Sequence, residues 1–114
     1  MNIKNKIKIE HAVSLRDEDW GFLQTNNIIS TTNRDENIVE LLLSIIPHEI
    51  EVDGRRYYFT LRKIGTSAYH SEYWRWRDVK HRDFEPYSYQ WFYGKCPVTA
   101  LFQMVKWLHE NKKL

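Results

Sequence analysis

The sequence of 114 residues predicts an α+β fold, in which an antiparallel β-meander of three or four strands is packed on one face by two helices. Three observations support this fold class: a hairpin signal at Asp53-Gly54, an apolar helical segment that ends before Pro47, and an amphipathic segment that begins at Pro97. Helices on one face of an antiparallel sheet leave the other face open. With 42% hydrophobic and 28% charged residues and no linker or repeat, residues 1–114 are expected to form a single domain.

The N-terminal third is expected to contribute an edge strand, a short helix and a loop. Residues 3–13 alternate apolar and charged side chains, and their lysines are typical of an edge strand. A short helix is expected over residues 15–22, because Ser14 is followed three residues later by Asp17. Residues 24–32 are mostly polar and are typical of a loop.

A longer helix is predicted from Asn33 to Ile46. Asn33 and Glu36 have the spacing of a capping box, in which each side chain accepts a hydrogen bond from a backbone N–H group at the helix start. Pro47 ends the helix. We expect this helix to be largely buried because its apolar stripe is wide: Ile38, Val39, Leu41, Leu42, Leu43, Ile45 and Ile46.

The hairpin signal predicts a two-residue turn, since both turn positions require a positive φ that Asp-Gly tolerates. That turn pairs Val52 with Arg55 and Ile50 with Tyr57. One face of the hairpin then holds Ile50, Val52, Tyr57, Phe59 and Leu61, and the other holds Glu49, Glu51, Arg56, Tyr58, Thr60 and Arg62.

Two aromatic strands are predicted next, over residues 73–79 and 87–93, with a turn at 65–70 and a charged connection at 80–86. We expect the large rings of Trp74, Trp76, Tyr89 and Trp91 to face the helices. The alternation of side chains along each strand then assigns Glu51, Arg56, Tyr58, Arg62, Tyr73, Arg75, Arg77, Gln90 and Phe92 to the open face.

Charge is distributed unevenly along the chain. Residues 1–53 carry 5 Lys/Arg and 10 Asp/Glu, whereas residues 54–82 carry 8 Lys/Arg and only 2 Asp/Glu. A basic central segment is typical of a protein with an anionic partner, although it also fits internal charge complementarity.

The predicted binding residues are the arginines and tyrosines of the open face. A guanidinium group can form paired hydrogen bonds with carboxylates or phosphates and can stack on aromatic rings. We therefore expect a small, non-enzymatic binding module that engages an acidic protein or a nucleoprotein. The alternative function is single-stranded nucleic-acid binding, with bases stacked on the same face; an ordinary solvated sheet face is the structural alternative. The site residues are Arg56, Tyr58, Arg62, Tyr73, Arg75 and Arg77.

Two features suggest chemistry, and we interpret both as structural. Cys96 precedes Pro97 at a helix start, where the helix dipole favours a thiolate, so a thiol enzyme is a further alternative. His81, Asp83 and Glu85 alternate and could share one side of a strand as metal ligands, but their surroundings are typical of a polar turn. No cofactor, no metal and no catalytic residue are expected.

The expected location is the cytoplasm. Cys96 is the only cysteine, so an internal disulfide is impossible and a reducing compartment is favoured. No apolar run is long enough to cross a membrane, and the N-terminal segment lacks the continuous apolar stretch of a signal peptide. Composition leaves the oligomeric state open.

The closing segment, with Tyr93-Gly94-Lys95-Cys96-Pro97-Val98-Thr99-Ala100-Leu101 and then Trp107-Leu108, resembles the ending of many small proteins encoded by phages and mobile elements. It differs from them in having Cys96 where threonine is more usual. The resemblance implies an intracellular protein that binds a host component, such as an inhibitor or adaptor, and has no catalytic role.

Overall fold

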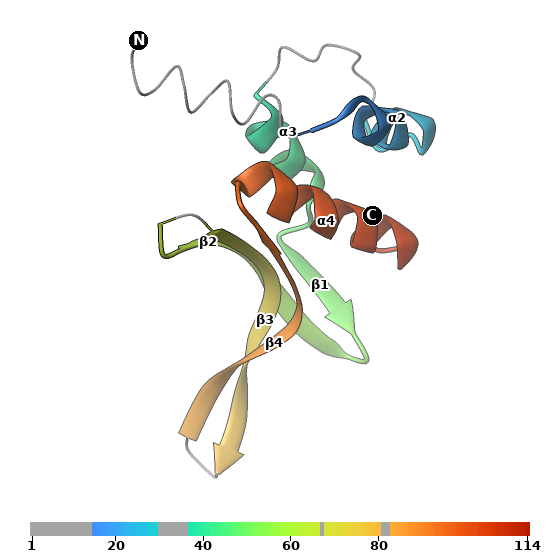
Figure 1. Ribbon diagram of the computed structural model, residues 1–114. Coiled ribbons are helices and arrows are strands. Elements are labelled where there is room, and N and C mark those ends of the chain that lie inside the picture. Colours follow the sequence, from blue (N-terminus) through green and yellow to red (C-terminus); the bar gives the residue numbers. More distant parts are fainter. Residues whose placement is uncertain (1–14, 30–36, 67, 81–82) are drawn as a thin grey trace.

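The computed structural model describes residues 15–29, 37–66, 68–80 and 83–114, and within this part of the chain the fold is α+β, as predicted. The four antiparallel strands lie in the order β1 (Glu49–Val52), β2 (Arg55–Ile64), β3 (Ala68–Lys80) and β4 (Asp83–Gly94). The helices α2 (Asp17–Thr25), α3 (Ile38–Ile45) and α4 (Pro97–Glu110) gather at one end of the sheet (Figure 1). The expected N-terminal edge strand and the Asn33–Glu36 capping pair lie outside the described residues.

Local hydrogen bonds define where the first two helices begin. The backbone N–H of Arg16 donates to the Asp19 carboxylate at 3.0 Å, so α2 starts two residues later than predicted. Asn37 caps α3, because its side-chain oxygen accepts from the N–H of Val39 at 3.1 Å. The buried stripe of α3 is narrower than expected, since Leu43 is exposed to solvent.

The hairpin prediction is confirmed pair by pair. Asp53 and Gly54 adopt φ values of 52° and 78°, and β1 pairs with β2 in the predicted register. Ile50 and Tyr57 are consequently buried, whereas Tyr58 on the opposite face is exposed.

The core lies between α4 and one face of the sheet. The hydroxyl of Ser71 on β3 donates to the backbone oxygen of Ala100 on α4 at 2.7 Å, which joins the two elements inside the core. α2 packs on the outer side of α4, where the rings of Phe22 and Phe102 meet edge to face at 5.9 Å. α4 supplies the largest buried stripe: Val98, Leu101, Phe102, Met104, Val105 and Leu108.

The predicted orientation of β3 is wrong. β3 begins at Ala68, not Tyr73, and a turn of three residues pairs Ile64 with Ala68 and therefore Phe59 with Tyr73. Tyr73 accordingly faces the helices, is 0% exposed, and donates a hydrogen bond from its hydroxyl to the Pro47 backbone oxygen at 2.6 Å. Trp74 pairs with Tyr58 on the open face. The length of the turn sets the register, and this register reverses every side chain of β3 relative to the prediction.

A β-bulge lies in the middle of β4. Tyr73 pairs with Gln90 and Trp74 with Ser88, so Tyr89 is the extra residue. Tyr89 faces the helices as expected, and its ring lies 6.0 Å from that of Trp107. Trp91 pairs with Glu72 and lies on the open face, contrary to the prediction.

Beyond the last β2–β3 pair, β3 and β4 continue as a two-stranded ribbon that projects away from the helices (Figure 1). β4 begins at Asp83, so much of the expected charged connection over residues 80–86 belongs to this ribbon. Among the described helices, none has the length and apolar character needed to cross a membrane.

Candidate functional site

The structure divides the six predicted binding residues between the two faces of the sheet. Tyr73 is buried in the core, so its predicted exposure is wrong. Arg75 and Arg77 lie on the same side of the sheet as Tyr73, which is the helix side. They belong to the ribbon, which projects beyond the helices (Figure 1). The remaining three lie on the open face as predicted: Arg56, Tyr58 and Arg62.

A hollow of about 490 Å³ surrounds Arg75 and Arg77 on the helix side of the sheet. It lies where the tip of the β1–β2 hairpin meets the base of the ribbon. We call it the arginine–tyrosine hollow; its lining is Val52, Asp53, Arg55, Tyr57, Arg75, Arg77, Tyr87 and Tyr89.

Arg75 is held in place by two aromatic rings. Its guanidinium carbon lies 5.8 Å from the centre of the Tyr57 ring and 5.6 Å from that of Tyr87. Its Nη1 donates to the backbone oxygen of Trp76 at 3.2 Å, and its buried Nε has no hydrogen-bond partner among the described residues. Arg75 is therefore oriented by rings and backbone, while no described carboxylate neutralises its charge.

The other two arginines of the hollow differ in their partners. Arg77 lies over the Tyr87 ring at 4.8 Å and forms an ion pair with Glu85. Arg55, at the hairpin, makes no ion pair with any described residue. Because Asp53 is the one acidic residue in the lining, the hollow has an excess of positive charge.

The tyrosines connect the hollow to the core. The Tyr57 and Tyr89 rings lie 4.8 Å apart, and Tyr57 and Tyr87 lie 6.5 Å apart. Tyr57 is buried, and Tyr89 also contacts Trp107 on α4. The rings that orient Arg75 are thus fixed by packing that reaches the helical layer.

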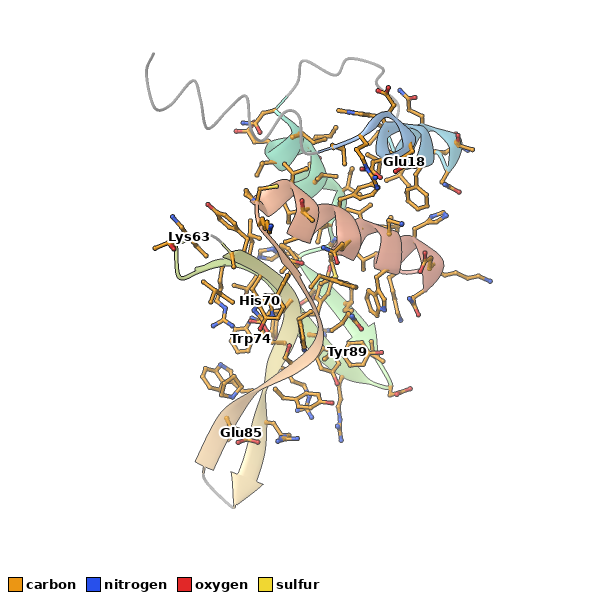
Figure 2. All side chains as sticks on the ribbon, in the orientation of Figure 1. Glu18, Lys63, His70, Trp74, Glu85 and Tyr89 are labelled. Atoms are coloured by element: carbon orange, nitrogen blue, oxygen red, sulfur yellow. The ribbon has the colours of Figure 1, made fainter. Side chains whose placement is uncertain are left out.

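A second depression, of about 480 Å³, lies on the open face. Figure 2 shows His70 and Trp74 on this side of the sheet, with Tyr89 on the other side and Glu85 far down the ribbon. We call this depression the tryptophan pocket; its lining is Thr60, Arg62, His70, Glu72, Trp74, Trp76, Pro86, Ser88, Trp91 and Tyr93.

The floor of the tryptophan pocket is a polar network. Arg62 Nη2 lies 3.2 Å from Glu72 Oε1 and 3.1 Å from His70 Nδ1. The Ser88 hydroxyl donates to Glu72 Oε2 at 2.9 Å, and the indole N–H of Trp74 donates to the Thr60 hydroxyl at 2.6 Å. One oxygen of the nearly buried Glu72 carboxylate is therefore ion-paired with Arg62, and the other accepts a hydrogen bond from Ser88.

His70 is neutral in this network. A guanidinium group can only donate, so Nδ1 of His70 must accept from Arg62 and the ring proton must lie on Nε2. Burial lowers the pKa of His70; Glu72 opposes this effect and Arg62 adds to it. With His70 neutral, the charges of Arg62 and Glu72 balance within the pocket.

Aromatic rings form the walls of the tryptophan pocket. The Trp74 and Trp76 rings meet edge to face at 5.3 Å, and Trp91 and Tyr93 do so at 4.8 Å. Tyr93 also stacks on His70 at 4.7 Å. Three of these rings are strongly exposed: Trp76 at 58%, Trp91 at 46% and Tyr93 at 51%.

Two further features concern the chemical alternatives, namely Cys96 and the set of His81, Asp83 and Glu85. Cys96 occupies the N-cap of α4, as expected, with its sulfur 3.2 Å from the Thr99 hydroxyl. His81 lies outside the described residues, and Glu85 is engaged by Arg77. In the described part of the chain, no group of three His, Cys, Asp or Glu residues could hold a metal ion.

The sequence-based site omitted Arg55, Tyr57 and Tyr87 of the hollow, and of the tryptophan pocket it included only Arg62. The length of the turn after β2 could have indicated both, because it places Trp74 opposite Tyr58 and Arg75 on the side of Tyr57. The bulge at Tyr89 has no comparable signal in the sequence.

Comparison of the chain with protein-family models, with curated proteins and with solved structures finds no match.

Proposed function

We propose that this protein is a non-enzymatic binding module that engages an acidic surface of a protein or nucleoprotein through the arginine–tyrosine hollow. The observation that carries the proposal is Arg75, whose guanidinium lies against the rings of both Tyr57 and Tyr87 without a carboxylate partner among the described residues. A cation fixed in this way loses little conformational entropy when it binds an anion.

The distribution of ion pairs supports this choice of site. On the open face, Arg56 lies 4.0 Å from Glu49, and Arg62 lies 3.2 Å from Glu72. In the hollow, Arg55 and Arg75 have no such acidic partner in the described residues. An incoming carboxylate therefore finds uncompensated positive charge in the hollow, with paired charges on the open face.

The hollow also provides the hydrogen bonds that a carboxylate requires. Arg55 and Arg75 can each donate two parallel N–H groups to one carboxylate, a geometry that gives both strength and direction. The bond between Arg77 and Glu85 helps to fix the ribbon beside them. The resemblance of the closing segment to phage-encoded proteins supports a host component as the partner, and an inhibitor or adaptor role for this protein.

The test is binding of a short Asp/Glu-rich peptide, measured by fluorescence anisotropy at low salt. Because a charge reversal replaces attraction with repulsion, Arg75→Glu should weaken binding at least about tenfold, equivalent to about 1.4 kcal/mol. Arg56→Glu is the matched control, since it reverses an arginine of the same sheet on the opposite face. Equal losses in both variants, or no measurable binding by the unaltered chain, would contradict the proposal.

Single-stranded nucleic acid is the second candidate for the same hollow. The observation in its favour is Tyr89, whose ring is 37% exposed and lines the hollow together with the arginines, as a base-stacking residue should. An oligothymidylate would then bind with an affinity that falls steeply between about 50 and 200 mM salt, and Tyr89→Ala would weaken it. Stronger binding of the oligonucleotide than of the acidic peptide would favour this function over the first.

A further inference from the structure

The tryptophan pocket is a separate site from the arginine–tyrosine hollow. The two share no lining residue, and they open on opposite faces of the sheet. A volume of about 480 Å³ lies within the range of small-molecule sites, roughly 300–1,000 Å³. The pocket arises because small side chains, Thr60 and Ser88, stand among large rings on neighbouring strands.

Charge restricts the class of ligand that this pocket can take. Its two charged groups, Arg62 and Glu72, form an ion pair at 3.2 Å, and His70 is neutral. A net cation or anion would thus find no uncompensated opposite charge in the lining. The phosphates of a nucleic acid would find the same balance, so the pocket favours a neutral ligand.

The ion pair nevertheless keeps free hydrogen-bonding capacity. The contacts of Arg62 with His70 and Glu72 use Nη2, so its Nε and Nη1 hydrogens are not engaged by any described residue. Of the Glu72 oxygens, Oε2 accepts from Ser88 and Oε1 is ion-paired with Arg62, although a carboxylate has about four acceptor positions. Donors and acceptors therefore lie side by side at the floor, which matches a group that both donates and accepts at adjacent atoms.

The walls require a ligand with apolar faces. Trp76, Trp91 and Tyr93 leave about half of their surface in solvent, although burial of such rings is worth several kcal/mol in a typical protein. Trp91 and Tyr93 pack against His70 and against each other, and Trp76 packs against Trp74. A flat apolar surface could pack against them without a change in the sheet.

We propose that the tryptophan pocket binds a neutral carbohydrate, with the C–H face of a pyranose ring packed on the indoles and neighbouring hydroxyls bound to Arg62 and Glu72. A sugar ring combines the three required properties: no charge, an apolar face, and adjacent hydroxyl groups that each donate and accept. The ligand is a neutral oligosaccharide with room for one or two rings in the pocket.

The test is titration of the unaltered, ¹⁵N-labelled protein with cellohexaose, chitohexaose and maltohexaose, observed through the indole N–H resonances. The five tryptophans provide an internal comparison. Trp74, Trp76 and Trp91 line the pocket and should shift with at least one sugar, whereas buried Trp20 and helix-bound Trp107 should not.

Variants then assign the binding to the pocket. Trp91→Ala should lower the affinity for the sugar at least about tenfold, as expected for loss of a stacking ring. Glu72→Gln should weaken it with the fold retained, since the amide keeps the shape and loses half of the acceptor capacity. Tyr58→Ala is the matched control, because Tyr58 is exposed on the same face and does not line the pocket.

Three outcomes would overturn the proposal. One is the absence of any shift with all three sugars at millimolar concentration. Another is a shift of the pocket indoles by tetramethylammonium or N-methylguanidinium without one by the sugars, which would make this a cation site. The third is a selective shift by oligothymidylate, which would assign the pocket to a nucleobase.

Discussion

Tyr73 and Trp76 show that, in a strand rich in aromatic residues, the residue type does not determine which side chains are buried. Both are large, both lie on β3, and they face opposite sides of the sheet. Tyr73 is completely buried with its hydroxyl on the Pro47 carbonyl, whereas Trp76 is 58% exposed. Tyrosine is amphipathic and becomes a core residue when its hydroxyl finds an acceptor. Burial also raises the pKa of the Tyr73 hydroxyl, so the ring stays uncharged.

Ring size alone would predict a larger loss of stability for a change at Trp76 than for one at Tyr73, and we expect the opposite order. Tyr73→Phe leaves the Pro47 carbonyl without this donor and should lower the free energy of unfolding by about 1–3 kcal/mol. Trp76→Ala removes a larger but exposed ring and should cost about 1 kcal/mol or less. Urea denaturation monitored by circular dichroism measures both. A larger loss for Trp76→Ala than for Tyr73→Phe would contradict the orientation of β3.

His70 should make stability sensitive to mild acid. Its folded pKa lies below the usual 6.5, so the unfolded chain binds a proton first as pH falls. The free energy of unfolding is therefore at its full value above the ordinary pKa of 6.5, and it decreases as the pH falls from 6.5 towards the lower folded pKa. Urea midpoints measured across this range should fall toward acid pH in the unaltered protein. The decline should be smaller in His70→Gln; an identical profile in that variant would show that other groups cause it.

At the scale of elements, the sequence-based predictions are correct for elements whose position is set by neighbouring residues. They are wrong where the orientation of a strand depends on its pairing with another strand. The Asp53-Gly54 turn specifies its own register, and the predicted pairs of β1 and β2 are all present. Pro97 likewise marks the start of α4 as predicted. In contrast, β3 is oriented by a turn without a strong two-residue signal, and Trp residues were assumed to be buried.

The same distinction explains the outcome for the candidate site. Arg56, Tyr58 and Arg62 belong to the well-specified hairpin, and their predicted open-face position is correct. Tyr73, Arg75 and Arg77 belong to β3, and all three lie on the opposite face from the one predicted. The composition of the segment indicated an aromatic and basic stretch, but the face on which each of its side chains lies depended on one turn.

The junction between β4 and α4 depends on Gly94. A Cβ added there would lie 2.7 Å from the backbone nitrogen of Ala100 and 2.8 Å from the Thr99 Cβ, closer than such atoms can approach. Gly94→Ala should therefore displace the start of α4 and lower the free energy of unfolding by about 1–3 kcal/mol. Thermal and urea unfolding provide the measurement.

Gly21 is the matched control for that substitution. It lies inside α2 and has no atom within 4 Å of the position that a Cβ would take. Gly21→Ala should stabilise the protein by about 0.5–1 kcal/mol, since alanine is the better helix former. If both alanine variants changed stability in the same direction, close packing at Gly94 would not be the cause.

At the scale of the whole molecule, the sheet separates two kinds of surface. The helix side carries uncompensated arginines beside tyrosines, and the open side carries balanced charge beside tryptophans. The helices cover only one end of the sheet, and the ribbon extends both faces beyond them (Figure 1). The two proposed sites therefore lie on opposite faces, so a ligand at one would leave the other open.

Binding at the two surfaces should be independent. Trp91→Ala should leave affinity for the acidic peptide within about twofold, and Arg75→Glu should do the same for the sugar, because the sites share no residue and energies at separate sites add within about 0.5 kcal/mol. Titration of each variant with both probes measures this. A loss of both activities in either variant would reveal coupling through the sheet.

The bulge at Tyr89 determines which residues of β4 line the arginine–tyrosine hollow and which line the tryptophan pocket. Without the extra residue, the part of β4 on one side of it would turn over. Either Tyr87 and Ser88 would exchange faces, or Trp91 and Tyr93 would turn toward the helices. In each case the tryptophan pocket loses lining residues and the hollow loses Tyr89, and in the first case the hollow loses Tyr87 as well. Deletion of a single codon would thus alter the lining of both proposed sites in one step, while every aromatic residue except Tyr89 remained in the gene.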